Sequence, residues 1–404
     1  MMKAIPVVLI LLASSAVAAC AAGAPAAGRS PSTSRAKQEA GAARRRVRIG
    51  AAQPKRRLVD HGIRDPRSVL AAVGVNLGEL EKLIHKAGAA GCDVLALPED
   101  TLGLGHWEAG NAKLLGKVLP AAVDQLLQRL GRAAARHGMY LCCCSDTIGP
   151  DGALRNTAFL LGRDGKEIGR YHKVNMPIHE LHKKRGEGFP VFATDDLGDV
   201  GMLICYDMVF PETARCLALG GADIIFHLTL GGAAIGPGDV SRAAFRTRAV
   251  ENYVYIVVAQ RGSGSMILSP KGEILAEGKK AGDIVIAEID PAGGREGGDA
   301  MNRQSDMRAR LFRERWPAAY GLLTHPKPPV LRKVPQETSI EQAVRIANAA
   351  LTVGEGEFAS AEALMRDGKT EQARRAFQAL IAKYARTWIE YASRKRLARM
   401  EAVR

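Results

Sequence analysis

Aromatic side chains are scarce in this sequence, at 5% of 404 residues. Lys and Arg outnumber Asp and Glu, which gives a formal net charge of +15. The basic residues gather at 44–46, at 303–315 and near the C-terminus, not between aromatic residues. Proteins that bind single-stranded nucleic acid stack the bases on aromatic side chains along a basic groove. The composition therefore argues against nucleic-acid binding and fits an anionic membrane surface better.

Sequence patterns for zinc and nucleotide sites are also missing. No C-x-x-C pair with nearby histidines occurs, and the histidines of His179-Glu180-Leu181-His182 are three residues apart. Two zinc ligands on one helix face need a spacing of four. The glycine-rich stretches at 231–232 and 262–264 do not open a helix after a G-x-G-x-x-G pattern, so a nucleotide cradle is not expected.

The first twenty residues are typical of an export signal, with Lys3 before an apolar run at 5–12 and small residues up to Ala19. The run is shorter than the roughly 20 apolar residues that span a bilayer. Val17-Ala18-Ala19-Cys20 resembles a bacterial lipobox. We therefore predict a signal peptide at 1–19, lipidation of Cys20, and an exported lipoprotein anchored in the membrane of a bacterial cell envelope. The alternative is an ordinary cleaved signal with a coincidental cysteine.

After Cys20, a tract of Ala, Gly, Ser, Pro and Arg predicts a disordered tether at 20–45. From residue 46 to 325, short apolar runs alternate with amphipathic segments. We expect helices at 68–91, 119–137 and 211–220. The expected strands are 47–53, 92–97, 139–145, 157–161, 168–173, 191–194, 200–205, 224–228, 253–260, 266–269 and 283–289. So many strands with few long helices favour two layered sheets with helices outside.

The composition changes at a Pro-rich linker, 326–337. Residues 338–404 carry no strand pattern and predict a small all-helical appendage. Its helix, turn at Gly368 and second helix weakly resemble a tetratricopeptide-type hairpin. A single repeat of this kind cannot bury its own apolar face. We therefore expect the appendage to pack on the main domain or on a partner protein of the envelope.

Three residues of complementary chemistry stand at the ends of predicted strands: Glu99, Lys173 and Cys205. A thiol attacks well only as a thiolate, so Glu99 is a candidate general base. Lys173, with the backbone N–H of Tyr206, can stabilise a thiolate and an oxyanion. Each residue alone also has an ordinary interpretation, as a solvated glutamate, a surface lysine or a buried cysteine. The other cysteines, Cys92, Cys142, Cys143, Cys144 and Cys216, are expected to pack in the interior.

The sequence around these residues resembles the nitrilase, or carbon–nitrogen hydrolase, superfamily. The resemblance rests on Leu97-Pro98-Glu99, on 169–173 with Met176-Pro177, on 201–212, and on the 246–252 segment. It implies an α-β-β-α sandwich of two mixed sheets, usually paired as a homodimer, with no metal or organic cofactor. Glu99, Lys173 and Cys205 take the roles of base, oxyanion stabiliser and nucleophile.

The resemblance also points to residues that position the substrate. Glu180 is similar to a second glutamate of many members, although Glu187 lies close by. Tyr206 follows the nucleophile, and Trp107, in the 101–111 loop with His106, is a candidate pocket wall. His227 begins a stretch, 227–232, that departs from the family pattern and is a further candidate.

We therefore expect hydrolysis of a non-peptide C–N bond in a small linear amide or N-carbamoyl amine through a thioester. Alternatives are acyl transfer to an amine, or an envelope scaffold with a vestigial site. The basic 183–185 run beside His182 favours either an acidic substrate or simply a solvated loop.

Overall fold

The computed structural model describes residues 46–55, 57–231, 238–291, 307–334, 339, 341–342, 354–385 and 388–402. The predicted signal peptide, the lipidated Cys20 and the tether lie outside the described residues. Within the described ranges, no helix combines the length and apolar character needed to cross a membrane.

The first of two six-stranded sheets has the order β12-β1-β2-β3-β4-β5. Its strands are β1 (Val47–Gln53), β2 (Val94–Ala96), β3 (Tyr140–Ile148), β4 (Leu154–Leu161), β5 (Glu167–His172) and β12 (Asp283–Ile289). Strands β1, β2 and β3 run parallel to one another, whereas β12, β4 and β5 pair antiparallel. The sheet is therefore mixed, as the resemblance implied.

The second sheet has the order β11-β10-β9-β8-β7-β6. Its strands are β6 (Val191–Ala193), β7 (Asp199–Ile204), β8 (Ile224–Thr229), β9 (Tyr255–Gln260), β10 (Met266–Leu268) and β11 (Ile274–Glu277). Strands β7, β8 and β9 are parallel. The sequence pattern missed β11, because its four side chains are only partly buried or exposed and form no apolar run.

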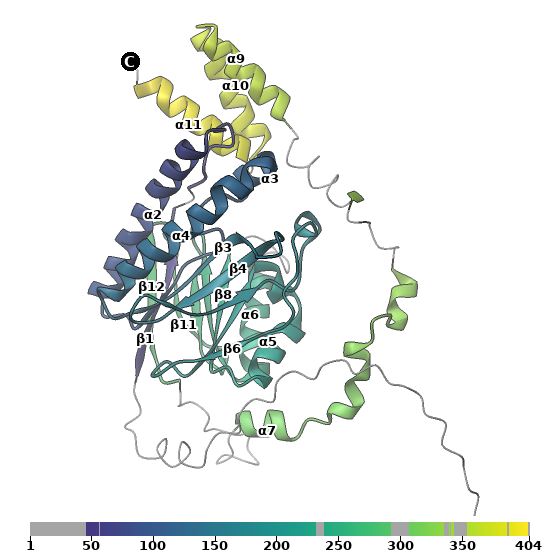
Figure 1. The fold of residues 1–404 in the computed structure, drawn as a ribbon. Coiled ribbons are helices and arrows are strands. Elements are labelled where there is room, and N and C mark those ends of the chain that lie inside the picture. Colours follow the sequence, from purple (N-terminus) through teal and green to yellow (C-terminus); the bar gives the residue numbers. More distant parts are fainter. Residues whose placement is uncertain are drawn as a thin grey trace, which may run out of the picture. The chain divides into compact units, whose positions relative to one another are not determined.

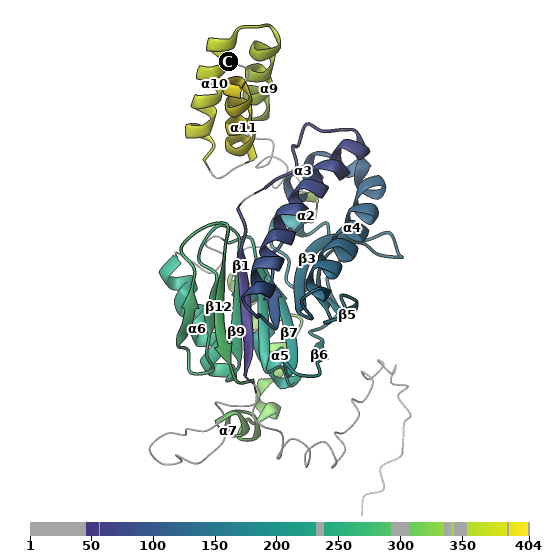
Figure 2. The same cartoon turned by 90° about the vertical axis from the view of Figure 1, so that its left-hand side faces the viewer.

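Helices cover the outer face of each sheet (Figures 1 and 2). Helices α2 (Pro66–Ala89) and α4 (Leu115–Ala135) pack on the first sheet around Leu77, Leu126 and Phe159. Helices α5 (Pro211–Leu219) and α6 (Gly238–Asn252) cover the second sheet. A third apolar layer lies between the two sheets. The predicted α-β-β-α sandwich is therefore confirmed.

Helix α2 shows how the sequence sets these elements. Asp65 caps its first turn by accepting the Ser68 N–H at 2.9 Å, and Pro66 occupies the first helical position. Its buried apolar residues recur every three or four positions, which gives one apolar face: Val69, Val73, Leu77, Leu80 and Ile84. This face packs on α4 and the sheet.

The three consecutive cysteines of β3 alternate between the two apolar layers. Cys143 belongs to the layer under the helices, whereas Cys142 and Cys144 face the space between the sheets. This is the period of two that a strand imposes. Cys92 is also buried, as predicted, but Cys216 is exposed on α5. The prediction that Cys216 packs in the interior was wrong, because its neighbours Ala214 and Leu217 occupy the inward face of that short helix.

The described part of the C-terminal region contains helices and no strand. It contains α7 (Met307–Arg313), η4 (Pro317–Thr324), η5 (Pro329–Lys333), α9 (Glu355–Arg366), α10 (Thr370–Lys383) and α11 (Trp388–Ala402). Helices α9, α10 and α11 share a small apolar core that includes Phe358, Phe377 and Ile389. Arg396 of α11 pairs with Glu362 of α9 at 2.6 Å. The helical appendage is therefore confirmed as a fold element, while its partner and the domain boundaries stay predictions.

Candidate active site

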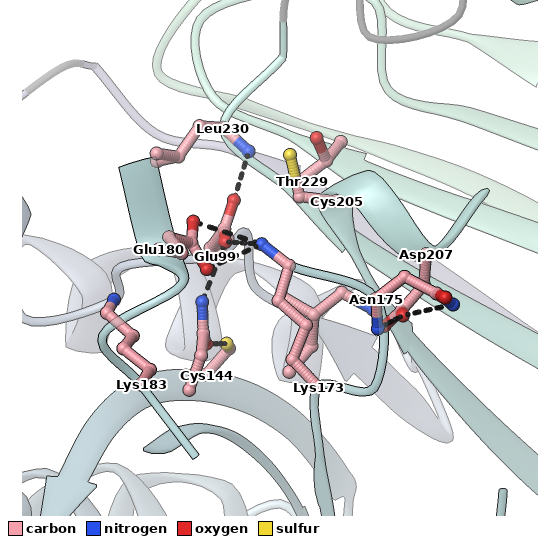
Figure 3. A network of polar contacts seen from close by, with 12 residues as sticks. Glu99, Cys144, Lys173, Asn175, Glu180, Lys183, Cys205, Asp207, Thr229 and Leu230 are labelled. Atoms are coloured by element: carbon pink, nitrogen blue, oxygen red, sulfur yellow. Dashed lines mark hydrogen bonds and ion pairs between the residues drawn. The ribbon is translucent and has the colours of Figure 1, made fainter. Parts of the chain in front are cut away.

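The strand ends bring Glu99, Lys173 and Cys205 to one place between the two sheets (Figure 3). Glu99 follows β2, Lys173 directly follows β5, and Cys205 directly follows β7 as the first residue of η3 (Cys205–Val209). The Lys173 Nζ lies 3.2 Å from the Glu99 Oε1. Parallel strands end at the same edge of a sheet, so β7, which ends before Cys205, and β8, which ends at Thr229, reach the site together.

Lys173 is the buried cation at the centre of this arrangement. Its side chain is 0% exposed, and its ammonium donates to both carboxylate oxygens of Glu180, at 3.1 and 3.0 Å, as well as to Glu99. Burial alone lowers the pKa of Lys173, but Glu99, Glu180 and Cys205 outweigh burial and hold that pKa well above its usual value. The lysine is therefore a fixed positive charge, which suits a stabiliser of anions and not a base.

Glu99 is held in a defined orientation by three donors. Besides Lys173, the Asn156 side-chain amide donates to its Oε1 at 2.9 Å and the Leu230 N–H donates to its Oε2 at 3.3 Å. The next residue, Asp100, has a left-handed φ of 54°. Arg261 bonds the Asp100 carboxylate and the Glu99 and Asp100 carbonyls. Strain of this kind persists where surrounding contacts impose it, and it is common at functional sites.

Cys205 also occupies a left-handed backbone conformation, with a φ of 43°. The turn leaves Cys205 a partly exposed residue, although the adjoining residues of β7 are buried. Burial and the charge of Glu99 raise the pKa of the Cys205 thiol to about 12, against the opposing effects of Lys173 and of the Thr229 hydroxyl. The resting thiol is therefore protonated and needs a base for attack.

Asp207 holds the turn that carries Cys205. Its Oδ2 accepts the Ile204 N–H at 3.1 Å and the Tyr171 hydroxyl at 2.7 Å, while its Oδ1 accepts the Asn175 N–H at 2.8 Å. The carboxylate is fully buried. It thus ties the end of β7 to the segment after Lys173. Asp207 lies within the 201–212 segment that carries the family resemblance, but the sequence pattern assigned it no role.

A second cysteine, Cys144, lies near the same charged pair. Its side chain is 0% exposed, and its Sγ bonds the Asn156 Oδ1 at 3.2 Å. Burial, followed by the charges of Glu99 and Asp146, raises the pKa of the Cys144 thiol well above its usual value. The site therefore contains a buried Glu99–Lys173 pair with two neutral thiols, of which only Cys205 reaches the surface.

Two residues predicted to position the substrate lie beside the catalytic candidates. Glu180, in η2 (Ile178–Glu180), bonds Lys173 directly, whereas the alternative Glu187 is exposed and away from these contacts. Tyr206 is half-buried next to Cys205, with its ring at the edge of Phe210.

The other two candidates, His227 and Trp107, lie in different surroundings. His227 Nε2 lies 3.1 Å from the Cys205 carbonyl oxygen, and burial lowers the pKa of His227 to about 4, so the ring is neutral. Trp107, in α3 (Gly105–Gly110), is fully buried in the apolar layer under the helices and donates its Nε1–H to the Ile63 carbonyl at 2.8 Å. Substrate contact by these four residues stays a prediction.

The fold and the site define a carbon–nitrogen hydrolase of the nitrilase superfamily. The sequence profile described as "Carbon-nitrogen hydrolase" matches residues 55–297. Because this match covers more than half of the chain, the protein belongs to that family and is a carbon–nitrogen hydrolase.

Several characterised proteins are similar to this chain. The "Deaminated glutathione amidase" of Synechocystis is 31% identical over 239 residues, which are 54% of this chain and 86% of the relative. A "Nitrilase" of Pyrococcus abyssi is 34% identical over 236 residues, 53% of this chain and 83% of the relative. The "N-carbamoylputrescine amidase" of Arabidopsis thaliana is 24% identical over 280 residues, 62% of this chain and 90% of the relative.

Solved structures share the fold. An amidase from Nesterenkonia sp. AN1, in a structure showing covalent addition of the acetamide moiety of fluoroacetamide at its active-site cysteine, matches with a TM-score of 0.50 and 24% identity. The match covers 61% of this chain and 91% of that one. The Caenorhabditis elegans NitFhit protein matches with a TM-score of 0.52 and 23% identity over 62% of each chain.

Proposed function

We propose that this enzyme hydrolyses a small linear amide or N-carbamoyl amine through a thioester on Cys205. The observation that carries the proposal is the partly exposed thiol on a strained turn beside the buried Glu99–Lys173 pair. A vestigial site would have no physical reason to keep a buried, fully paired ammonium next to an accessible thiol, because burying charges is costly.

In the first half-reaction, Glu99 removes the Cys205 Sγ proton as the sulfur forms a bond to the carbonyl carbon. The carbonyl oxygen becomes an oxyanion, which the Lys173 ammonium and the Tyr206 backbone N–H stabilise. The C–N bond then breaks, and the proton on Glu99 passes to the departing nitrogen. The products of this half are a free amine or ammonia and a thioester.

In the second half-reaction, water attacks the thioester carbon while Glu99 takes a proton from that water. The C–S bond breaks, the acid is released, and the sulfur recovers its proton. Glu180 keeps a second negative charge beside Lys173, and we propose that one of its oxygens accepts a substrate N–H in addition to the Lys173 ammonium.

The choice of Cys205 over Cys144 rests on access. Both thiols lie near Lys173 and both are protonated at rest, so electrostatics alone does not separate them. Cys144 lies inside β3 with no exposed surface and is bonded to Asn156. A carbonyl carbon cannot reach a sulfur that is packed on all sides, whereas Cys205 begins a turn and keeps part of its surface open.

The preference for amides over nitriles is supported by the names of relatives. The Synechocystis and Arabidopsis relatives are amidases, although the Pyrococcus relative is named a nitrilase. The basic 183–185 run gives little support for an acidic substrate. Lys183 pairs with Asp146, Lys184 pairs with Asp151 at 2.8 Å, and Arg185 bonds the Val174 carbonyl at 2.8 Å.

Release of ammonia or amine from a panel of small amides, N-carbamoyl amines and nitriles tests the proposal. We expect turnover of amides or N-carbamoyl amines by the wild type. Cys205→Ala should abolish that turnover, while Cys144→Ala should retain it within about tenfold. Turnover that survives in Cys205→Ala and disappears in Cys144→Ala would reverse the assignment of the nucleophile. Turnover of nitriles alone would overturn the amidase proposal.

We also propose that the enzyme works as a homodimer anchored in a bacterial cell envelope through lipidated Cys20. The support is the lipobox-like sequence at 17–20 and the usual pairing that the family resemblance implies. Cys20→Ser should move the full-length protein from the membrane fraction to the soluble fraction after cell lysis. Persistent membrane association of this variant would contradict lipid anchoring. Sedimentation of the purified enzyme would test the dimer.

A further inference from the structure

Glu180 is followed one turn later by Lys183, whose backbone N–H donates to the Glu180 carbonyl at 2.9 Å and whose buried ammonium the proposed reaction does not use. We propose that Lys183, ion-paired with Asp146 and backed by the Glu108 carboxyl, positions Glu180 and keeps it ionised for its role beside Lys173. This inference rests on the proposed function and adds three positioning residues to it. None of the three is expected to touch the reacting atoms.

The first step of the argument is burial. The Lys183 and Asp146 side chains are 12% and 7% exposed, and their charged groups form an ion pair. Buried ion pairs cost desolvation energy that their attraction barely repays, so they add little to stability. The buried Lys183 charge therefore needs a role other than stability. We assign it the effect on its neighbour Glu180. Figure 3 shows Lys173 and Lys183 on either side of Glu180.

The second step is the balance of charge around Glu180. Burial alone raises the pKa of this carboxyl, but Lys173 and then Lys183 reverse the effect and leave the pKa below its usual value. The Lys173 ammonium also interacts with Glu99 and with the Cys205 thiol, so Glu180 is not its only partner. Lys183 supplies the additional positive charge that lets two carboxylates remain ionised around one catalytic lysine.

The third step is Glu108, which lies behind the pair on α3. It is 8% exposed, and burial together with the adjacent Asp146 raises its pKa well above the usual value. Glu108 is thus a neutral acid that donates a hydrogen bond to Asp146. Asp146 then pairs with Lys183, and Glu108, being neutral, adds no second buried negative charge.

The charged and titratable groups that face this cluster come from several elements. They are Lys173 and Glu99 at the catalytic pair, Asp100 after β2, Asp146 on β3, Glu108 on α3, and His179, His182 and Glu180 on the loop of Lys183. Burial lowers the pKa of His179 and of His182, so both rings are neutral near pH 7. Besides Lys173, Lys183 is a cation that favours the ionised form of Glu180, so its removal should raise the Glu180 pKa.

The decisive substitution is Lys183→Met, with Lys184→Met as the matched control. Lys184 is the next residue, carries the same charge and pairs with Asp151 at the surface. Loss of Lys183 removes a positive neighbour, so Glu180 should take up a proton at higher pH. We expect the acidic limb of kcat/KM to move up by about one pH unit in Lys183→Met. Lys183→Arg should restore the wild-type limb, and Lys184→Met should keep it.

A direct readout separates this inference from the proposed function. In protein labelled with 13C at glutamate carboxyl groups, the Glu180 signal is identified by its loss in Glu180→Gln. Its titration should move to higher pH in Lys183→Met, whether or not an amide substrate is found. Glu108→Gln, which keeps a neutral donor to Asp146, should leave the titration of Glu180 in place.

An equal titration of Glu180 in Lys183→Met and Lys184→Met would overturn the inference, even if both variants turn over amides. If Lys183→Met fails to fold because Asp146 is left unpaired, the double variant Asp146→Asn/Lys183→Met removes the whole ion pair. A smaller upward shift is expected there, because loss of the Lys183 charge raises the Glu180 pKa while loss of the Asp146 charge partly offsets it. Absence of amide turnover in the wild type would contradict only the proposed function.

Discussion

The end of β7 and the interior of β3 each present a thiol to the same Glu99–Lys173 pair, yet the two strands give those thiols different chemistry. Cys144 is in regular strand backbone and is packed on every side. Cys205 lies one residue beyond its strand, in a left-handed turn, with part of its surface exposed. Burial raises the pKa of both thiols, so the surroundings activate neither at rest.

If Cys205 is the nucleophile, as we propose, closeness to a buried lysine is not enough to make a cysteine one. What distinguishes Cys205 is the turn at the strand end, which Asp207 holds through three neighbouring donors. Such a turn carries a conformational cost that is tolerated when contacts impose it. It leaves Cys205 partly exposed while the strand behind it is buried.

The largest expected effect among further tests comes from removing the base. With the pKa of Cys205 at about 12, only a small fraction of the thiol is ionised near neutral pH. Glu99→Gln should therefore lower kcat/KM about 10²- to 10⁴-fold, the range for loss of a general base. Steady-state amide hydrolysis measures the loss, and Glu187→Gln, at an exposed glutamate, is the control. Near wild-type turnover in Glu99→Gln would mean that another group takes the proton.

A smaller effect is expected on the reactivity of the thiol itself. The Lys173 charge lowers the pKa of Cys205, so Lys173→Met should raise that pKa further. Below its pKa, the thiolate fraction falls tenfold for each unit by which the pKa rises. Iodoacetamide labelling at pH 8, followed by mass spectrometry, should slow at least tenfold in Lys173→Met.

In the same labelling experiment, Cys144 should stay unmodified in the folded wild type, because its sulfur has no exposed surface. Labelling of Cys144 at a rate comparable with Cys205 would remove the distinction between the two thiols. The Lys184→Met variant, altered at a surface ion pair, should label like the wild type.

Much of this arrangement follows from sequence patterns. Strand periodicity accounts for the alternation of Cys142, Cys143 and Cys144 between the two apolar layers. Glu99, Lys173 and Cys205 each follow a strand-like segment, which predicted that their side chains lie near one another. Side chains at strand ends often line the site of a sheet protein. The two layered sheets followed from the number and shortness of the strands.

Other parts of the site depend on contacts that no local pattern encodes. Asn156 supports Glu99 from β4, 57 residues away in sequence. Asp146 meets Lys183 from β3, although the basic run around Lys183 suggested only a solvated loop or an acidic substrate. The sequence alone does not predict such a buried pair, because Lys and Asp are usually surface residues. The pair is recognised once the positions of β3 and the Lys183 loop are known.

The smallest expected effect comes from deleting the two neighbouring buried thiols one at a time. Cys143→Ala and Cys144→Ala each remove one sulfur from a fully buried position of β3, and each should lower the free energy of unfolding by about 1–2 kcal/mol. Cys144→Ala should cost slightly more, because it also removes the Sγ contact to the Asn156 Oδ1. Urea unfolding measures both changes, and Cys143, on the opposite face of the same strand, supplies the packing reference. If Cys144→Ala were as stable as Cys143→Ala but lost amide turnover entirely, the sulfur inside β3 would have to take part in the reaction, and access would no longer explain which thiol attacks.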